Sequence, residues 1–486
     1  MPSAPYRARL RARAPGAAGP LLTRVALPLL LAALPVLAVR PVSDPSPWLH
    51  LKVGAFLAGG GRFALPDPWA PLASHAYVPT QWLPSVVTVW LYPHLGAPLV
   101  AWERAAAIGV LALALLLWAH TLARPWVAAA TTAVAVFAAW PSLTERPQLA
   151  GFVLLVPVLA AWWRTAQDHQ ARWWLVPLTW LAACVHGIWA TGAAVGGIVA
   201  LCVIVSGSVG RQVALRLVGL LAACAAAAAL TPIGPRLLLT PFAVSGQGRQ
   251  FVQEWMPSSV RSPHVLAALA LLAVAWLCWV ALGRRMPGWH VVLVVVGCAL
   301  ALTMERTVAV AAFVAVPLTA TAVEAALRSR EGAPRDALPR RGRVLSRTTA
   351  AWAAATLVGM VVAGPVAAAR ADTPVGVPLG LTSRLTALPA DTTVLVDGDT
   401  SGWLMYAAPQ LRPVYDLRVE SYSAHQVKDF IGAMSADPGW DAYVRERGVT
   451  VALVPSDSPV RAALVEQDRW RELGRDHGHV LLEAPR

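Results

Sequence analysis

Long apolar runs separated by short polar segments dominate the first three quarters of the chain. A membrane-spanning α-helix needs roughly 20 apolar residues, and it satisfies its own backbone hydrogen bonds inside the bilayer. Charged residues make up 14% of the sequence, against about 25% in typical soluble domains. The sequence therefore predicts a mainly α-helical protein with a multi-pass bundle of about eleven spans. They fall near residues 25–39, 105–122, 126–141, 148–163, 173–186, 190–206, 212–231, 264–282, 289–303, 306–325 and 349–369.

Arginine-rich segments predict the orientation of this bundle. Residues 1–24 carry five arginines and no acidic residue, and residues 326–347 carry seven arginines. Cytoplasmic loops are enriched in basic residues, so both segments are expected in the cytoplasm with an even number of spans between them. The short apolar stretch 82–97 would make that number odd. We therefore expect it to form an interfacial or re-entrant helix on the outer face, and residues 48–57 to form a short amphipathic helix in the interface.

The C-terminal quarter differs in composition from the rest. Residues 1–370 have a net charge of +19, whereas residues 371–486 have −5, so the overall +14 belongs to the membrane part and does not indicate nucleic-acid binding. Strand-like patterns at 392–398, 413–419, 449–455 and 479–484 alternate with helical ones, which predicts a small extracytoplasmic α/β domain. The expected divisions are a basic cytoplasmic tail (1–24), a transmembrane domain (25–325) with outer loops at 41–80 and 232–262, a basic cytoplasmic linker (326–348), a last transmembrane helix (349–370) and the α/β domain (371–486).

Familiar catalytic motifs do not occur. The sequence has no GxxxxGK[ST], GxSxG or HExxH motif, which argues against a P-loop ATPase, a serine hydrolase and a zinc protease. All five cysteines fall inside apolar runs, so they indicate neither a disulfide framework nor a metal cluster.

Two acidic residues on the expected outer side are the first candidates for chemistry. Asp44 follows the first span; it could act as a general base or a metal ligand facing a lipid-borne substrate, or it could cap the next helix. Glu145 and Arg146 lie between the third and fourth spans. Arg146 could hold a phosphate with Glu145 beside Asp44, or the two neighbours could simply pair with each other.

Four further residues on the same side are candidates for substrate binding. His50 and His186 could contact a substrate, or they could be satisfied interfacial histidines. Arg306 could bind phosphate or neutralise its neighbour Glu305, and Glu254 lies in the second outer loop.

Several short sequence segments, taken in their order along the chain, resemble the GT-C superfamily. This superfamily comprises polytopic membrane glycosyltransferases that use lipid-phosphate-linked sugars. The resemblance is to the dolichyl-phosphate-mannose mannosyltransferase type and, more narrowly, to a bacterial family of GT-C-like membrane proteins. The matching pieces are D-P-S-P-W-L-H-L-K-V-G (44–54), E-R-P-Q-L (145–149), H-G (186–187), P-I-G-P-R-L-L (232–238), E-W-M-P (254–257), E-R-T-V (305–308), S-G-W-L (401–404) and Y-D-L-R-V-E-S-Y (415–422).

The resemblance implies an inverting transfer on the outer face of the cell membrane. The donor would be a polyprenyl-phosphate-linked sugar and the acceptor an envelope glycan, lipid or protein. It implies that Asp44 acts as base or metal partner and that Glu145 assists. No cofactor is firmly indicated, and a divalent metal bound by Asp44 and Glu145 is left open. Members of the superfamily often show paired acids in the first loop, whereas Asp44 has no acidic neighbour. That departure keeps a non-catalytic envelope assembly or scaffold protein as the alternative. A transporter is disfavoured because the interiors of the apolar runs are nearly free of charge.

Overall fold

The computed structural model describes residues 21–332 and 346–485. The expected basic tail lies almost entirely outside these residues, and so does most of the expected basic linker. Every predicted span coincides with a helix. These helices are Leu22–Ala38 (η1 Leu22–Ala26 with α2 Leu27–Ala38), α5 (Ala97–His120), α6 (Pro125–Ala139), α7 (Pro147–Asp168), α8 (Leu175–Val185), α9 (Trp189–Val205), α10 (Arg211–Ala229), α12 (Pro263–Ala281), α13 (Gly288–Thr303), α14 (Val308–Arg330) and α15 (Arg347–Arg370).

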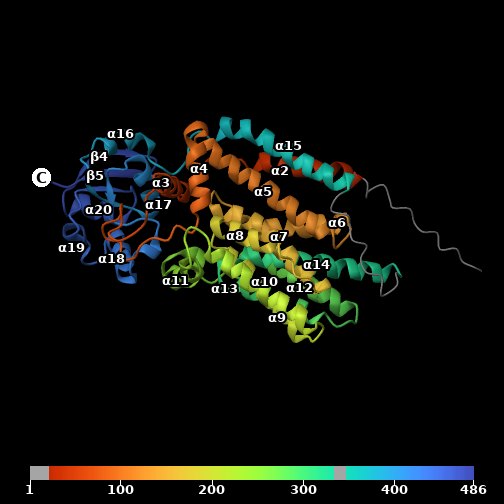
Figure 1. The fold of residues 1–486 in the computed structure, drawn as a ribbon. Helices are drawn as coiled ribbons and strands as arrows, with labels where there is room; N and C mark the ends of the chain where they lie inside the picture. The colour runs from red at the N-terminus through yellow and green to blue at the C-terminus, as the bar shows by residue number, and fades with distance from the viewer. Residues whose placement is uncertain (1–20, 333–345, 486) are drawn as a thin grey trace, which may run out of the picture.

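Six of these helices are long and apolar enough to cross a membrane, namely α5, α7, α10, α12, α14 with the turn before it, and α15. Shorter apolar helices pack among them in one bundle (Figure 1). Proline occupies the first position of α6, α7 and α12, where its missing N–H costs no hydrogen bond. Together with a small C-terminal sheet, this confirms a mainly α-helical membrane bundle with an appended α/β domain.

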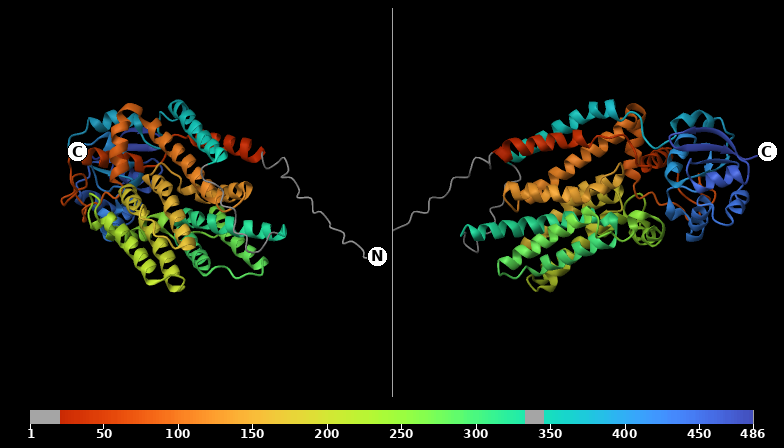
Figure 2. Two further views of the ribbon diagram at one scale, coloured as in Figure 1. Left: turned by 45° about the vertical axis from the view of Figure 1, so that its right-hand side comes forward. Right: turned by 180° about the vertical axis from the view of Figure 1, so that it is seen from behind.

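The two ends of the bundle differ. The start of α2 and the end of α14 both lie at the end away from the C-terminal domain (Figures 1 and 2). Three helices that were not predicted as spans, α3 (Ser46–Ala58), α4 (Trp82–Leu95) and α11 (Arg236–Phe251), lie at the opposite end, beside that domain (Figure 1). The bundle therefore places the two arginine-rich ends together, and it places both predicted outer loops next to the C-terminal domain.

Helix α3 differs from its prediction as an amphipathic interfacial helix. Trp48, Leu49, Leu51 and Val53, which point in several directions around the helix, are all buried. The reason is that α3 packs against α4 on one side and against α17 (Gly398–Ala407) of the C-terminal domain on another. The helix is thus enclosed between the membrane bundle and the C-terminal domain.

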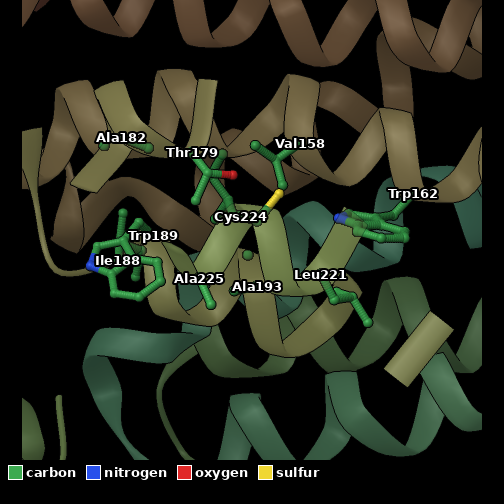
Figure 3. A pocket seen from close by; sticks show the side chains of 13 residues that line it. Val158, Trp162, Thr179, Ala182, Ile188, Trp189, Ala193, Leu221, Cys224 and Ala225 are labelled. Atoms are coloured by element: carbon green, nitrogen blue, oxygen red, sulfur yellow. The ribbon is translucent and has the colours of Figure 1, made fainter. Parts of the chain in front are cut away.

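Inside the bundle, α7, α8, α9 and α10 leave a small apolar cavity of about 60 Å³ (Figure 3). Val158 and Trp162 of α7, Thr179 of α8 and Cys224 of α10 line it. Ile188 and Trp189, at the start of α9, line both this cavity and the larger one described below.

The C-terminal domain is built on a five-stranded mixed sheet in the order β2-β1-β3-β5-β4. Strand β1 runs parallel to β2 and β3, whereas β5 runs antiparallel to β3 and β4. The strands are β1 (Thr393–Val396), β2 (Arg412–Pro413), β3 (Val451–Pro455), β4 (Arg471–Asp476) and β5 (His479–Glu483). Besides α17, the helices are α16 (Thr382–Thr386), α18 (Ala424–Met434), α19 (Trp440–Glu446) and α20 (Pro459–Glu466).

Three of the four predicted strands are present as β1, β3 and β5. The strand expected over 413–419 is wrong, because only Arg412–Pro413 pairs with β1 and the chain then turns into the short helix η6 (Val419–Ser421). Strand β4 was missed, since its sequence R-E-L-G-R-D is polar and lies at the sheet edge, where no buried face imposes an alternating pattern.

Candidate functional site

A cavity of about 1400 Å³ lies between the outer-loop end of the bundle and the C-terminal domain. Bundle residues form one wall and residues of the C-terminal domain form the facing wall. Five residues singled out in the sequence line it, namely His50, Arg146, His186, Glu254 and Arg306.

Four of these residues and Asp44 form one continuous polar chain. Arg146 Nε donates a hydrogen bond to Asp44 Oδ2 over 2.7 Å, and its Nη1 donates to Glu254 Oε2 over 2.7 Å. Arg306 Nη1 donates to the other oxygen of Glu254 over 3.1 Å. His186 Nε2 lies 3.1 Å from Arg306 Nη2. The Glu254 carboxylate thus holds the two guanidinium groups side by side, and Asp44 and His186 lie at the two ends of this series of polar contacts.

Asp44 follows α2 and takes part in two interactions at once. Its Oδ1 accepts a hydrogen bond from Ser46 N over 2.9 Å at the start of α3, while its Oδ2 pairs with Arg146. Burial raises the pKa of Asp44, but the Arg146 charge and the Ser46 hydrogen bond outweigh burial and hold the pKa below its ordinary value. The carboxylate is therefore ionised at neutral pH, and the helix-start role left open by the sequence is also present.

Arg146 is positioned by its place before Pro147, the first residue of α7. A residue before proline is restricted to extended backbone, and Arg146 has φ −117° and ψ 149°. A guanidinium offers five N–H donors. Among the described residues, Nη2 of Arg146 and Nε of Arg306 have no hydrogen-bond partner. Both arginines therefore keep donors for a ligand in the cavity.

Glu145 takes different partners from its neighbour. Its carboxylate accepts bonds from Arg40 Nε over 2.8 Å and Nη2 over 3.1 Å, and Arg104 Nε lies 3.6 Å away. Since Arg146 pairs with Asp44 and Glu254, the ion pair between Glu145 and Arg146 that the sequence left open is not formed. Glu145 is buried and is not among the residues that line the cavity.

The two histidines are both neutral. His50 Nδ1 lies 3.1 Å from Ser85 Oγ, which itself donates to Gln81 O, so the imidazole is the donor to serine. The pKa of His50 is lowered to about 4, mainly by burial; the charge of Asp44 opposes this shift and the charge of Arg146 adds to it. Burial also lowers the pKa of His186 well below its usual range, and Arg306 adds to this effect.

Asp44 and Glu145 are the two residues at which the sequence left a divalent metal open. Each carboxylate is already bound by at least one guanidinium. Within residues 21–332 and 346–485, no three or more histidine, cysteine or acidic side chains are grouped so that they could hold a metal. Metal binding by these two residues stays a prediction, and the reaction proposed for this cavity takes no step through a metal.

The facing wall was not anticipated as part of a site. Asp399, Leu417, Arg418, Glu420 and Phe430 of the C-terminal domain line the cavity. No sequence pattern pointed to Asp399, because D-G-D-T before a helix indicates only a helix cap. Asp397 takes that role by accepting a hydrogen bond from Thr400 N over 3.0 Å.

From the residue types of the C-terminal domain we predict an internal polar cluster of Trp403, Asp416, Arg418 and Tyr422, and the structure forms this cluster in part. Arg418 Nη2 donates to Asp416 Oδ2 over 2.6 Å, and Tyr422 lies close enough for Asp416 to raise its pKa, after burial as the main cause. Trp403 instead belongs to the separate core between α3 and the sheet.

Arg418 has one further partner, which the sequence did not predict. Its Nη1 donates to Asp67 Oδ2 over 2.9 Å, which joins the C-terminal domain to the first outer loop.

The sequence matches no family model and no curated protein. Solved structures show what the fold resembles. The archaeal oligosaccharyltransferase AglB from Archaeoglobus fulgidus, solved with an inhibitory peptide and a dolichol-phosphate, superposes with a TM-score of 0.51 at 11% identity, covering 88% of this chain and 69% of that one. The arabinofuranosyltransferase AftD from mycobacteria, in a mutant form, superposes with a TM-score of 0.51 at 17% identity, covering 90% of this chain but 37% of that one.

These likenesses confirm the GT-C-like fold. They do not specify the dolichyl-phosphate-mannose type within it.

Proposed function

We propose that this chain is a membrane glycosyltransferase that transfers a sugar from a polyprenyl-phosphate donor to a cell-envelope acceptor on the outer face of the membrane. The observation that carries the proposal is the pair of guanidinium groups, Arg146 and Arg306, held together by Glu254 on the bundle wall of the cavity.

The arginine pair suits a phosphate that leaves with negative charge. Charge-assisted hydrogen bonds from guanidinium to phosphate are shorter and stronger than neutral ones. Fixed donors aimed at developing charge stabilise the transition state without reorganisation. Arg306 is further held by Trp255, whose ring centroid lies 5.1 Å from the guanidinium carbon. Asp44 would act here by holding Arg146, and Glu145 by pairing with Arg40 and Arg104.

The lining of the cavity also suits a lipid-linked donor. Apolar side chains of the bundle, among them Trp189, Leu237 and Leu239, line the cavity beside the arginine pair. AglB, with which the fold is shared, was solved with a dolichol-phosphate. A polyprenyl chain could therefore remain among apolar helices while its phosphate reaches Arg146 and Arg306.

Binding of undecaprenyl phosphate to the full chain in lipid nanodiscs tests this assignment. We expect Arg306→Met to weaken that binding by about 10-fold or more, since a hydrogen bond to a charged group contributes about 1.5–3 kcal/mol. Arg475→Met is the matched control, because Arg475 pairs with Glu472 on the surface of the C-terminal domain. Wild-type protein that binds undecaprenol as tightly as undecaprenyl phosphate would contradict the proposal. Phosphate-dependent binding with no transfer to any acceptor would favour the scaffold alternative.

Action on the outer face depends on the orientation that the arginine count predicts. We expect a cysteine introduced at Ser329 near the end of α14 to be protected from a membrane-impermeant maleimide added to intact cells. A cysteine at Ser458 in the C-terminal domain should react, because both positions are polar and only one is expected outside. Labelling of the Ser329 position without permeabilisation would contradict the predicted orientation.

A further inference from the structure

The carboxylates that line the cavity differ in whether they already have a partner. Glu254 is bound by two arginines. Asp399, Glu420 and Glu305 line the same cavity, and none of the three side chains makes a hydrogen bond or ion pair with any other residue in the described part of the chain. An inverting transfer needs a carboxylate that is free to take a proton, so these three are the candidates.

Position separates the three carboxylates. In an inverting displacement the base lies on the face of the sugar opposite the leaving group. Glu305 precedes Arg306 on the bundle wall, on the same side as the proposed phosphate site. Glu420 is on the facing wall, but Arg418 and Arg306 both lie near enough to act on its charge. Asp399 is also on the facing wall, but the charges that act on it are two carboxylates, Asp397 and Asp44, and only one arginine, Arg146.

Packing fixes the place of Asp399 relative to the bundle. Helix α17, which carries it, packs directly on α3. A Cβ at Gly402 would lie 3.2 Å from Pro45 O and 3.3 Å from Leu49 N, so the glycine allows this close approach. Asp397 caps the start of α17, so the Asp399 side chain is not needed for that role.

We propose that Asp399 of the C-terminal domain is the base that accepts the proton of the acceptor hydroxyl, an assignment that rests on the proposed glycosyltransferase function. The hydroxyl oxygen forms a bond to the anomeric carbon of the donor sugar. The bond from that carbon to the phosphate oxygen breaks, and its electron pair leaves with the phosphate held by Arg146 and Arg306. The hydroxyl proton passes to a carboxylate oxygen of Asp399.

The charges around Asp399 suit this role. Burial raises the pKa of Asp399, the neighbouring charges of Asp397 and Asp44 raise it further, and Arg146 opposes them. A carboxylate with a raised pKa binds a proton more tightly and is the better base near neutral pH. The rate should fall as the pH drops through this raised pKa, because the protonated carboxyl can no longer accept a proton.

The test measures two properties of each variant. One is binding of undecaprenyl phosphate to the full chain in nanodiscs. The other is transfer from tritiated undecaprenyl-phosphate monosaccharides (mannose, glucose, galactose and arabinose) to isolated bacterial envelope glycan. We expect Asp399→Asn to lower kcat by about 10²–10⁴-fold, the usual contribution of a general base, with binding of undecaprenyl phosphate unchanged. Asp399→Glu should recover part of the rate. In Asp399→Asn, the decrease of kcat at low pH should disappear. Asp457→Asn, at an exposed position of the same domain, is the matched control.

Four results would overturn the assignment. Wild-type transfer in Asp399→Asn would do so while leaving the glycosyltransferase function intact. Loss of both lipid binding and transfer in Asp399→Asn would show a structural role instead. Loss of transfer with retained binding in Glu420→Gln or Glu305→Gln, but not in Asp399→Asn, would move the base to that residue. Failure of the wild-type protein both to bind undecaprenyl phosphate and to transfer any sugar would overturn the proposed function, and this assignment with it.

Discussion

Replacing Asp44 by asparagine should lower sugar transfer by at least about 10²-fold, the effect expected when a reacting group is misplaced by about 1 Å. Asparagine can keep the hydrogen bond from Ser46 N, but it cannot keep the charge that pairs with Arg146. Arg146 would then be held only by Glu254, and the donor phosphate would lose a fixed partner. Expression and membrane insertion should stay near normal, because the side-chain volume is unchanged.

Asp44→Asn should also weaken binding of undecaprenyl phosphate, whereas Asp399→Asn should not. The ion pair of Asp44 and Arg146 contributes to stability at neutral pH, since the pKa of Asp44 is lowered in the folded protein. That contribution is lost only as the pH falls through the lowered pKa. Transfer at the wild-type rate in Asp44→Asn would remove Asp44 from the site, both as a positioning group and as the base that the sequence suggested.

Replacing Arg418 by methionine should destabilise the contact between the C-terminal domain and the first outer loop by about 3–5 kcal/mol, the cost of breaking a buried ion pair from one side. Arg418, Asp67 and Asp416 have fully buried side chains, and one guanidinium satisfies both carboxylates. The rings of Trp69 and Tyr77 lie 5.0 and 5.2 Å from the Arg418 guanidinium carbon, so the cation is enclosed by residues of the loop.

Thermal unfolding and limited proteolysis of the full chain measure this effect. Arg418→Met should lower the unfolding midpoint and expose residues 41–80 to protease. Arg475→Met removes an arginine from an exposed pair in the same domain, and it should leave the unfolding midpoint nearly unchanged. Equal unfolding midpoints for the two variants would show that the buried pair does not hold the loop.

Local sequence was enough to determine the membrane bundle. A spanning helix must satisfy its backbone hydrogen bonds within its own segment, so each apolar run could be assigned to a helix without knowing its neighbours. Arginine counts were also enough to place the start of α2 and the end of α14 at the same end of the bundle, as the structure shows. Residue type and place along the chain likewise singled out Asp44, Arg146, Glu254, Arg306 and His186, which the fold brings together.

Only the tertiary structure decided which of these groups meet. Residues 44, 146, 254 and 306 are far apart in the chain. No local pattern shows that Arg146 pairs with Asp44 and Glu254 while Glu145 pairs with Arg40. The same holds for Asp399, which reaches the cavity because Gly402 lets α17 pack closely on α3. Helix formation in a membrane is a local requirement, whereas the pairing of charges depends on how separate elements pack, and that information is spread over the whole chain.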